Sequence, residues 1–344
     1  MRFGILRRDF SILTTLLLLT LPACDREFQL IEIEGSTMGT VYSVRLNAAG
    51  FDEQKAMLKN GIEDVLQEIN RQMSTWDSQS VLSSINRYSD TDWIGIPEDI
   101  YKVLKAALEI ARQTDGALDI TVGPLVNLWG FGPDKSPTTI PDEQTIQALL
   151  DRTGYTLLEL DPESTRLRKK RPELYIDLSA LAKGYAVDEI ARYLDRRGIS
   201  NYLVEVGGEI QAHGVNTENK PWQIGIEKPL SDKFEIQRIV PLSNQGMATS
   251  GDYRNFRMID GVRYSHTIDP RTGKPVSHDL AAVTVIHPST MMADGIATAL
   301  LVMGPENGLE YAEEMDLGVL FVIREKDDFH EIMTPSFKNL IQNE

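Results

Sequence analysis

Apolar residues recur along this chain at two spacings, and each spacing predicts a different element. Between residues 180 and 197 they recur every three or four positions, so they form one face of a helix. That face consists of Ala182, Ala186, Val187, Ile190, Ala191 and Leu194. The same spacing, often bounded by proline or glycine, predicts helices over residues 52–72, 98–114, 142–152, 290–303 and 306–314.

Short alternating or continuous apolar runs predict strands elsewhere. Two are expected at residues 29–34 and 40–46, around a tight turn in "GSTMG", and another in "ELYID" at 173–177. Further runs lie at 201–206, 222–227, 236–242, 246–251, 262–269, 280–286 and 317–323. Because strands and helices do not alternate steadily, we expect an α+β fold with mixed, largely antiparallel sheets and flanking helices.

The N-terminal segment predicts export and lipidation. Three arginines precede an apolar run over about residues 12–21, which is half the ~20 residues that a membrane-spanning helix needs. The following "LPAC" resembles the lipobox of bacterial lipoproteins, in which the cysteine becomes the lipidated first residue. Asp25 resembles the signal that retains such proteins in the inner membrane. We expect a signal peptide at residues 1–23, a lipid anchor on Cys24 and a periplasm-facing inner-membrane lipoprotein.

Composition excludes several kinds of site. Cys24 is the only cysteine, so an intrachain disulfide or a cysteine-rich metal site is impossible. The five histidines show no paired spacing, which disfavours zinc. The net charge of −16, without a basic stripe, disfavours a nucleic-acid partner. The length after the signal peptide suits a single domain of two intimate lobes over residues 24–344.

The helix predicted at 180–197 has polar residues of two kinds. Asp188 and Glu189 fall outside the apolar face, and with Arg192 we expect them to form a solvated ion-pair surface. Asp177 ends the predicted strand before the helix, and Lys183 lies in the first helical turn. A lysine there opposes the helix dipole, which a polyanionic ligand at the same terminus would reverse.

Seven polar stretches, six of which contain glycine, separate the predicted elements. They are "GSTMGT", "MSTWDSQS", "DGALDITVGPLVNLWGFG", "VGGEI", "TSGDYRNF", "SHTIDPRTG" and "ADGIATAL". Each alone indicates a turn, although such turns beside aromatic and acidic residues also suit a flat, phosphorylated ligand. In this order and spacing they resemble the ApbE family, the FAD:protein FMN transferases, over residues 35–303.

The resemblance implies a reaction. FAD would be bound with Mg²⁺, and its FMN half transferred to a threonine, sometimes serine, hydroxyl of an acceptor protein with release of AMP. Acceptors in the family include subunits of the Na⁺-pumping NADH:quinone oxidoreductase and related electron-transfer complexes. A Mg²⁺-dependent FAD pyrophosphatase and a flavin-binding lipoprotein without turnover are alternatives. Asp294 and His266 argue against the last, since pure binding needs no metal carboxylate beside a base.

Asp294 and Thr298 are the candidate metal ligands. They lie four positions apart, so a carboxylate and a hydroxyl share one helix face. Oxygen ligands of this kind suit Mg²⁺ better than zinc. The structural alternative is a helix-capping aspartate followed by a buried threonine. The resemblance adds the backbone carbonyl of Ala180 to the metal ligands.

The resemblance also implies a flavin pocket. Its lining residues would be Met38, Trp76, Ala117, Leu118, Asp119 and Ile268, with Asp177 and Lys183 facing the nucleotide. Many relatives have tyrosine in place of Trp76, and tryptophan lacks the phenol's hydrogen bond. His266 is the candidate general base, because its unperturbed pKa of ~6.5 lies near working pH, and Asp177 is the next candidate. A histidine bonded to a strand backbone is the alternative for His266.

Overall fold

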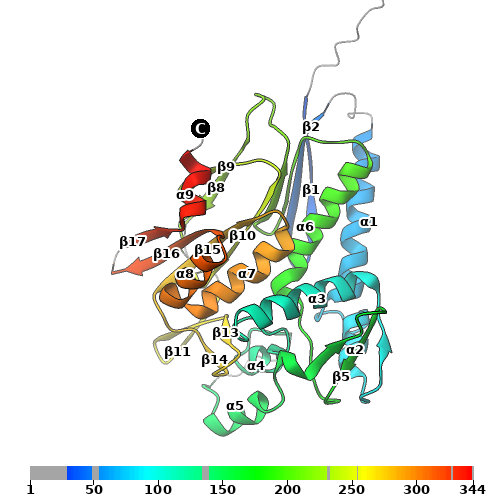
Figure 1. Ribbon diagram of the computed structural model, residues 1–344, viewed down its shortest axis with the longest axis vertical. Coiled ribbons are helices and arrows are strands. Elements are labelled where there is room, and N and C mark those ends of the chain that lie inside the picture. Colours follow the sequence, from blue (N-terminus) through cyan, green and yellow to red (C-terminus); the bar gives the residue numbers. More distant parts are fainter. Residues whose placement is uncertain are drawn as a thin grey trace, which may run out of the picture.

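The computed structural model describes residues 29–48, 54–133, 139–230, 233–253, 255–326 and 328–342, and within them an eight-stranded antiparallel sheet forms the centre (Figure 1). The strand order is β1-β2-β6-β7-β10-β15-β16-β17. The strands are β1 Gln29–Thr37, β2 Thr40–Ala48, β6 Tyr202–Val206, β7 Glu209–His213, β10 Gln245–Gly251, β15 Leu280–His287, β16 Gly318–Glu325 and β17 Asp328–Met333. Together with the flanking helices this confirms the α+β prediction.

Each face of the sheet is covered by its own layer. On one face lie helices α1 Lys55–Met73, α3 Glu98–Gln113, α6 Ser179–Arg196, α7 Thr290–Met303 and α8 Pro305–Glu314. On the other lie the ribbon of β8 Trp222–Glu227 and β9 Ile236–Leu242 and the helix α9 Pro335–Gln342. No helix among the residues described is long and apolar enough to cross a membrane.

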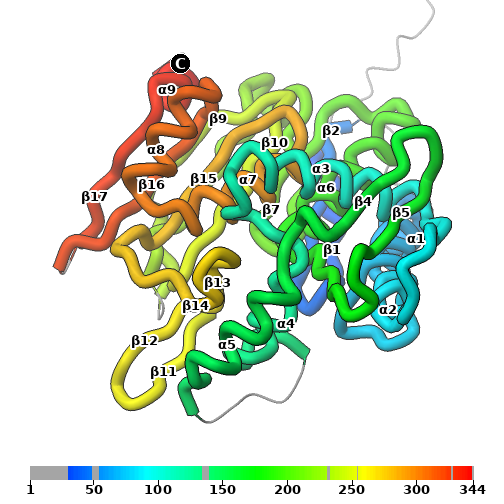
Figure 2. The backbone as a smooth tube through the Cα atoms, turned by 60° about the horizontal axis from the view of Figure 1, so that its bottom comes forward, coloured from blue at the N-terminus to red at the C-terminus, as the bar shows by residue number. Residues whose placement is uncertain are grey.

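Shorter elements lie beyond the end of the helical layer (Figure 2). They are α2 Val81–Arg87, α4 Gly123–Leu128, α5 Glu143–Leu150, β3 Ile94–Gly95, β4 Leu158–Leu160, β5 Arg166–Lys169, β11 Phe256–Ile259, β12 Val262–Ser265, β13 Ile268–Asp269 and β14 Lys274–Pro275. Trp129 stacks on Tyr264 with ring centroids 5.4 Å apart, and its indole N–H donates to the carbonyl of Gly273 at 2.8 Å. These contacts hold the β11–β12 hairpin and the β13–β14 turn against α4.

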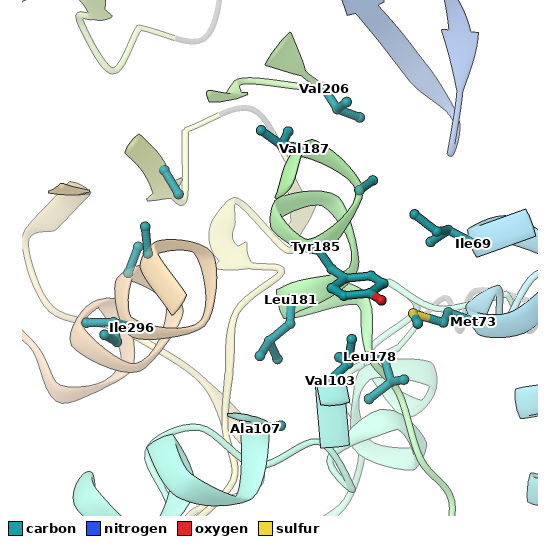
Figure 3. Packing of buried hydrophobic residues seen from close by; sticks show 14 of the residues in the cluster. Ile69, Met73, Val103, Ala107, Leu178, Leu181, Tyr185, Val187, Val206 and Ile296 are labelled. Carbon is teal, nitrogen blue, oxygen red and sulfur yellow. The ribbon is translucent and has the colours of Figure 1, made fainter. Parts of the chain in front are cut away.

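Helix α6 is packed from several directions, as Figure 3 shows. Leu181 points toward α3, while the ring of Tyr185 lies near α1 and Val187 points toward Val206 of β6. The hydroxyl of Tyr185 also donates to Asp99 of α3 at 2.6 Å. The apolar face predicted for this helix is buried except at Ala182, which is half-buried, and contacts with α7 cover further sides of the helix.

The predicted helices and most predicted strands are confirmed within a few residues. The strand predicted in "ELYID" is wrong, although Leu174 and Ile176 are buried as its alternation requires. Its backbone bonds to non-strand partners instead. The side-chain amide of Asn86 in α2 donates to the carbonyl of Ile176 and accepts its N–H, and the N–H of Asp177 donates to the carbonyl of Ile120 at 2.7 Å. The strand expected over 262–269 is split into β12 and β13.

Candidate active site

A small cavity of about 60 Å³ lies between the start of α6, the middle of α7 and two loops. Seven of the residues predicted for the site line it: Ala117, Leu118, Asp119, Asp177, Ala180, Ile268 and Thr298. They come from four separate segments of the chain. The structure therefore brings together residues that were singled out from distant motifs.

The carboxylate of Asp119 fixes the loop that forms one wall of this cavity. It accepts hydrogen bonds from the N–H and hydroxyl of Thr121, at 2.8 and 2.7 Å, and from the N–H of Tyr155 at 2.7 Å. Burial raises the pKa of Asp119, and these hydrogen bonds oppose the rise. Three donors occupy the carboxylate, so its side chain holds Ala117 and Leu118 in place against the cavity.

Asp177 shapes the start of α6 in a similar way. Its carboxylate accepts the N–H of Ser179 at 2.9 Å, one of the free donors of the first helical turn. Further along, the N–H of Gly184 donates to the Asp294 carboxylate at 3.0 Å. A regular helix directs this N–H to the carbonyl of Ala180, so that carbonyl receives at most a shared bond and keeps capacity for a cation.

Lys183 and two buried carboxylates form a cluster between α6, α7 and β7. The ammonium donates to Oε1 of Glu209 and lies 3.8 Å from Oδ1 of Asp294. Burial would lower the pKa of Lys183, but the two carboxylates raise it above its ordinary value. Burial raises the pKa of Glu209 to about 7, with Asp294 adding to the rise and Lys183 opposing it. The pKa of Asp294 is also raised, mainly by burial.

The turn between β6 and β7 leaves room for this lysine. Gly207 and Gly208 have φ of 62° and 102°, which L side chains rarely adopt. A Cβ on Gly207 would lie 2.8 Å from Cγ2 of Thr40 and 3.3 Å from Cδ of Lys183. The "VGGEI" turn, the "STMGT" turn and the lysine stem thus meet at one place.

Met38 occupies the turn between β1 and β2 in a strained conformation. Its φ is 49° and that of Gly39 is 71°, as a two-residue hairpin turn with two left-handed positions requires. Methionine is unusual at such a position, where asparagine or glycine is favoured. The strain is an observed outlier of the kind that clusters at functional sites.

Asp188 corrects one prediction. It is 7% exposed and accepts hydrogen bonds from the hydroxyl of Ser289 at 2.6 Å and the N–H of Thr290 at 2.8 Å, at the start of α7. The prediction of a solvated Asp188 is wrong, because these free helix donors need a buried acceptor. Arg192 pairs with Glu189 instead, and in this pair the arginine is exposed while the glutamate is half-buried.

Asp294 does not cap α7, which excludes the structural alternative for this residue. Ser289 is the N-cap, and Asp294 lies more than one turn inside the helix with 3% exposure. One turn later, the hydroxyl of Thr298 lies 3.1 Å from that of Ser250. No group of three or more His, Cys, Asp and Glu side chains within the described ranges could hold a metal. The oxygen donors of Asp294, Thr298 and Ala180 fit a hard cation such as Mg²⁺.

His266 lies between β12 and β13, outside the lining of the cavity. Its Nδ1 is 3.0 Å from the carbonyl of Asn255, and its ring meets Phe131 edge-on at 6.3 Å. A carbonyl only accepts, so Nδ1 must be protonated and Nε2 of the neutral ring keeps its lone pair. Burial lowers the pKa of His266, although the bond to Asn255 opposes this. The histidine is bonded to backbone, as in the structural alternative, and retains a free basic nitrogen.

Five of the predicted residues do not line the cavity: Met38, Trp76, Lys183, His266 and Asp294. Other residues of the site were missed. Trp76 is 72% exposed in the loop between α1 and α2, and Cys24 lies outside the described residues. Glu209 was missed, although "VGGEI" was among the quoted stretches; a glutamate directly after two glycines gave no reason to expect burial. Ser250 and Asn255 were missed because only the folded chain brings them to Thr298 and His266.

The sequence model of the ApbE family matches residues 38–321. The chain belongs to the ApbE family. It is 43% identical over 322 residues to the FAD:protein FMN transferase of Vibrio cholerae, covering 93% of this chain and 96% of that one. The Escherichia coli K12 FAD:protein FMN transferase is 40% identical over 326 residues, 94% of this chain and 92% of its own.

Solved structures agree with this assignment. The flavin transferase ApbE from Vibrio cholerae has a TM-score of 0.84 at 42% identity, covering 91% of this chain and 99% of that one. The apo flavinyl transferase ApbE of Pseudomonas stutzeri has a TM-score of 0.84 at 38% identity, covering 92% and 98%. The family and the enzyme class predicted from the motifs are therefore confirmed.

Proposed function

We propose that this ApbE-family protein transfers the FMN half of FAD to a threonine or serine hydroxyl of an acceptor protein, in a Mg²⁺-dependent reaction that releases AMP. The observation that supports it most strongly is the cavity whose walls contain seven predicted site residues from four separate segments of the chain. Asp294, expected to hold the cation, and Lys183, expected to face the nucleotide, lie 3.8 Å apart on the adjoining helices. Relatives named FAD:protein FMN transferase support the same reaction.

The reaction balances as a single displacement at phosphorus. The acceptor hydroxyl oxygen forms a bond to the phosphorus on the flavin side of the pyrophosphate, and the bond from that phosphorus to the bridging oxygen breaks. AMP leaves with the bonding electron pair. His266 accepts the hydroxyl proton at Nε2, the nitrogen left basic by the bond between Nδ1 and Asn255. Such a displacement depends chiefly on positioning and charge stabilisation.

The protein residues divide the remaining tasks. The Asp294 carboxylate, the Thr298 hydroxyl and the Ala180 carbonyl would hold Mg²⁺. When bound, the cation would offset the negative charge of the pyrophosphate. Lys183 would bind a phosphate oxygen, while Ile268, Ala117 and Leu118 would exclude water from the apolar part of the nucleotide.

Mass spectrometry of an acceptor tests this proposal. The purified protein is incubated with FAD, Mg²⁺ and a subunit of a Na⁺-pumping NADH:quinone oxidoreductase or related electron-transfer complex. The acceptor should gain one FMN and AMP should appear in equal amount, with neither product when Asp294→Ala replaces the wild type. Free FMN and AMP with an unmodified acceptor would instead identify a pyrophosphatase. FAD binding without any product would identify a flavin-binding protein.

We further propose that Cys24 is lipidated and holds the enzyme on the periplasmic side of the inner membrane. The apolar run, "LPAC" and Asp25 support this location. Several acyl chains on one cysteine would make the attachment effectively stable. Cell fractionation of Cys24→Ala should move the protein to the soluble fraction with its transferase activity intact. Retention of this variant in the membrane pellet would contradict the anchor.

A further inference from the structure

Glu209 is a buried charge that the proposed reaction does not use. It begins β7 directly after Gly207 and Gly208 and is 4% exposed. Its Oε1 accepts the Lys183 ammonium, while its Oε2 is buried and has no hydrogen-bond partner within the part of the chain that the structure describes. A buried carboxylate with one oxygen unsatisfied is costly, so its retention calls for a reason.

The neighbouring carboxylate supplies that reason. Asp294 Oδ1 lies 3.8 Å from the Lys183 ammonium, too far for a direct hydrogen bond. A shift of about 1 Å would convert this approach into a charge-assisted hydrogen bond at ordinary distance. Lysine has a flexible stem, so only a competing acceptor keeps the ammonium from making that shift. Glu209 is the competing acceptor.

We propose that Glu209 is a positioning residue, which holds the Lys183 ammonium away from Asp294 so that the Asp294 carboxylate remains available to a divalent cation. An ammonium and a divalent cation compete for the same carboxylate, and the closer the ammonium binds, the weaker the cation binds. This inference rests on the proposed function for the identity of the cation site. It adds a residue that neither contacts the cation nor reacts, but acts through Lys183.

The fold around Glu209 suits this role. The stem of Lys183 passes beside Gly207, where an added Cβ would lie 3.3 Å from Cδ of the lysine. Rotation about the bonds of this flexible stem is enough to carry the ammonium from the carboxylate on β7 toward the one on α7. Both carboxylates are attached to well-packed elements, so the balance is set by their charges.

The test measures Mn²⁺ binding to the FAD-free protein by electron paramagnetic resonance, with Mn²⁺ standing in for Mg²⁺ as a hard cation with oxygen ligands. Glu209→Gln keeps the volume of the side chain and removes its charge. Its Mn²⁺ dissociation constant should rise about 10- to 100-fold, the usual loss when a residue that supports a ligand is changed. Glu205→Gln, on the opposite face of the same hairpin, is the matched control and should bind like the wild type.

A double-variant cycle shows whether Glu209 acts through the lysine. With Lys183→Met, the competing ammonium is absent, so adding Glu209→Gln should then change the Mn²⁺ dissociation constant less than about 3-fold. The double variant removes both charges together and guards against a folding defect in Glu209→Gln alone. Thermal melts confirm that each variant is folded.

The outcomes separate this inference from the proposed function. If Glu209→Gln weakens Mn²⁺ binding equally in the presence and absence of Lys183, the inference is overturned, since Glu209 would then act by its own charge or through the fold. Wild-type affinity in Glu209→Gln would overturn it as well, while leaving the metal site in place. A wild-type protein that binds no Mn²⁺ would overturn both the inference and the metal-dependent part of the proposed function.

Discussion

The contact between α6 and α7 at Gly184 is so close that a single methyl group should disrupt the site. A Cβ on Gly184 would lie 2.5 Å from the carbonyl oxygen of Thr290 and 2.7 Å from Cα of Met291. Both atoms belong to the backbone of α7, so neither can rotate away. Ordinary contacts of this kind are 3.4 Å or more, so the helices must separate by about 1 Å in Gly184→Ala.

That separation would break the bond that orients Asp294. The N–H of Gly184 donates to its carboxylate at 3.0 Å, and an extra ~1 Å exceeds hydrogen-bonding distance. Overpacking costs about 1–3 kcal/mol and a lost bond to a charged group about 1.5–3, while alanine in a helix regains about 1. We expect Gly184→Ala to lower the free energy of unfolding by roughly 2–4 kcal/mol.

The assay combines urea unfolding with the rate of FMN transfer at a fixed, moderate Mg²⁺ concentration. Gly184→Ala should lose at least ~100-fold of the transfer rate, because displacement of a catalytic group by 1 Å has an effect of that size. Gly95→Ala is the matched control, since a Cβ on Gly95 would meet nothing within 4 Å. If Gly184→Ala unfolds and transfers like the wild type, the helix crossing does not position Asp294.

Three further predictions concern other parts of the site. His266→Ala should keep its FAD affinity but transfer FMN ~10²–10⁴-fold more slowly. Burial lowers the pKa of His266, so wild-type activity should fall only as pH drops through a value below ~6.5, and single-turnover rates against pH should lack this fall in the variant. Met38→Asn should relieve left-handed strain and raise stability by about 1 kcal/mol while weakening FAD binding in a fluorescence titration; unchanged affinity would remove Met38 from the pocket. Asp188→Ala should cost roughly 2–3 kcal/mol in urea unfolding, whereas Glu189→Ala should stay within about 0.5.

Helix faces were predictable because burial follows a period that the sequence displays. Five of the six residues predicted for the apolar face of α6 are buried, and the sixth, Ala182, is half-buried. The prediction for Asp188 was wrong because it assumed that only the apolar side of the helix is covered by other elements. Polar residues outside that side are then expected to be solvated. Here α7 begins against a second side, and its free N–H groups demand an acceptor that only the tertiary contact reveals.

The sequence could predict site residues only where they lie close together within one motif. The pair of Asp294 and Thr298 shares a helix face by spacing alone, and the "GALD" loop shows its glycine and aspartate together. Glu209 could not be predicted in this way, because its role depends on its ion pair with Lys183, which lies 26 positions earlier on another element. An ion pair between distant residues produces no recurring spacing in the sequence. From the sequence alone, a buried glutamate after a glycine turn therefore cannot be distinguished from a solvated glutamate.

Charge gives the proposed cation a larger role than the lysine. The protein has a net charge of −16, and of the described residues that line the cavity none is basic, while two are aspartates. Lys183 pairs with Glu209 and is approached by Asp294, so when both carboxylates are ionised the cluster carries one net negative charge. A pyrophosphate entering this site would be repelled, and burial makes that repulsion stronger than in water. A divalent cation on Asp294 would reverse the sign of the cluster, so the proposed metal would be needed for binding the nucleotide as well as for the displacement.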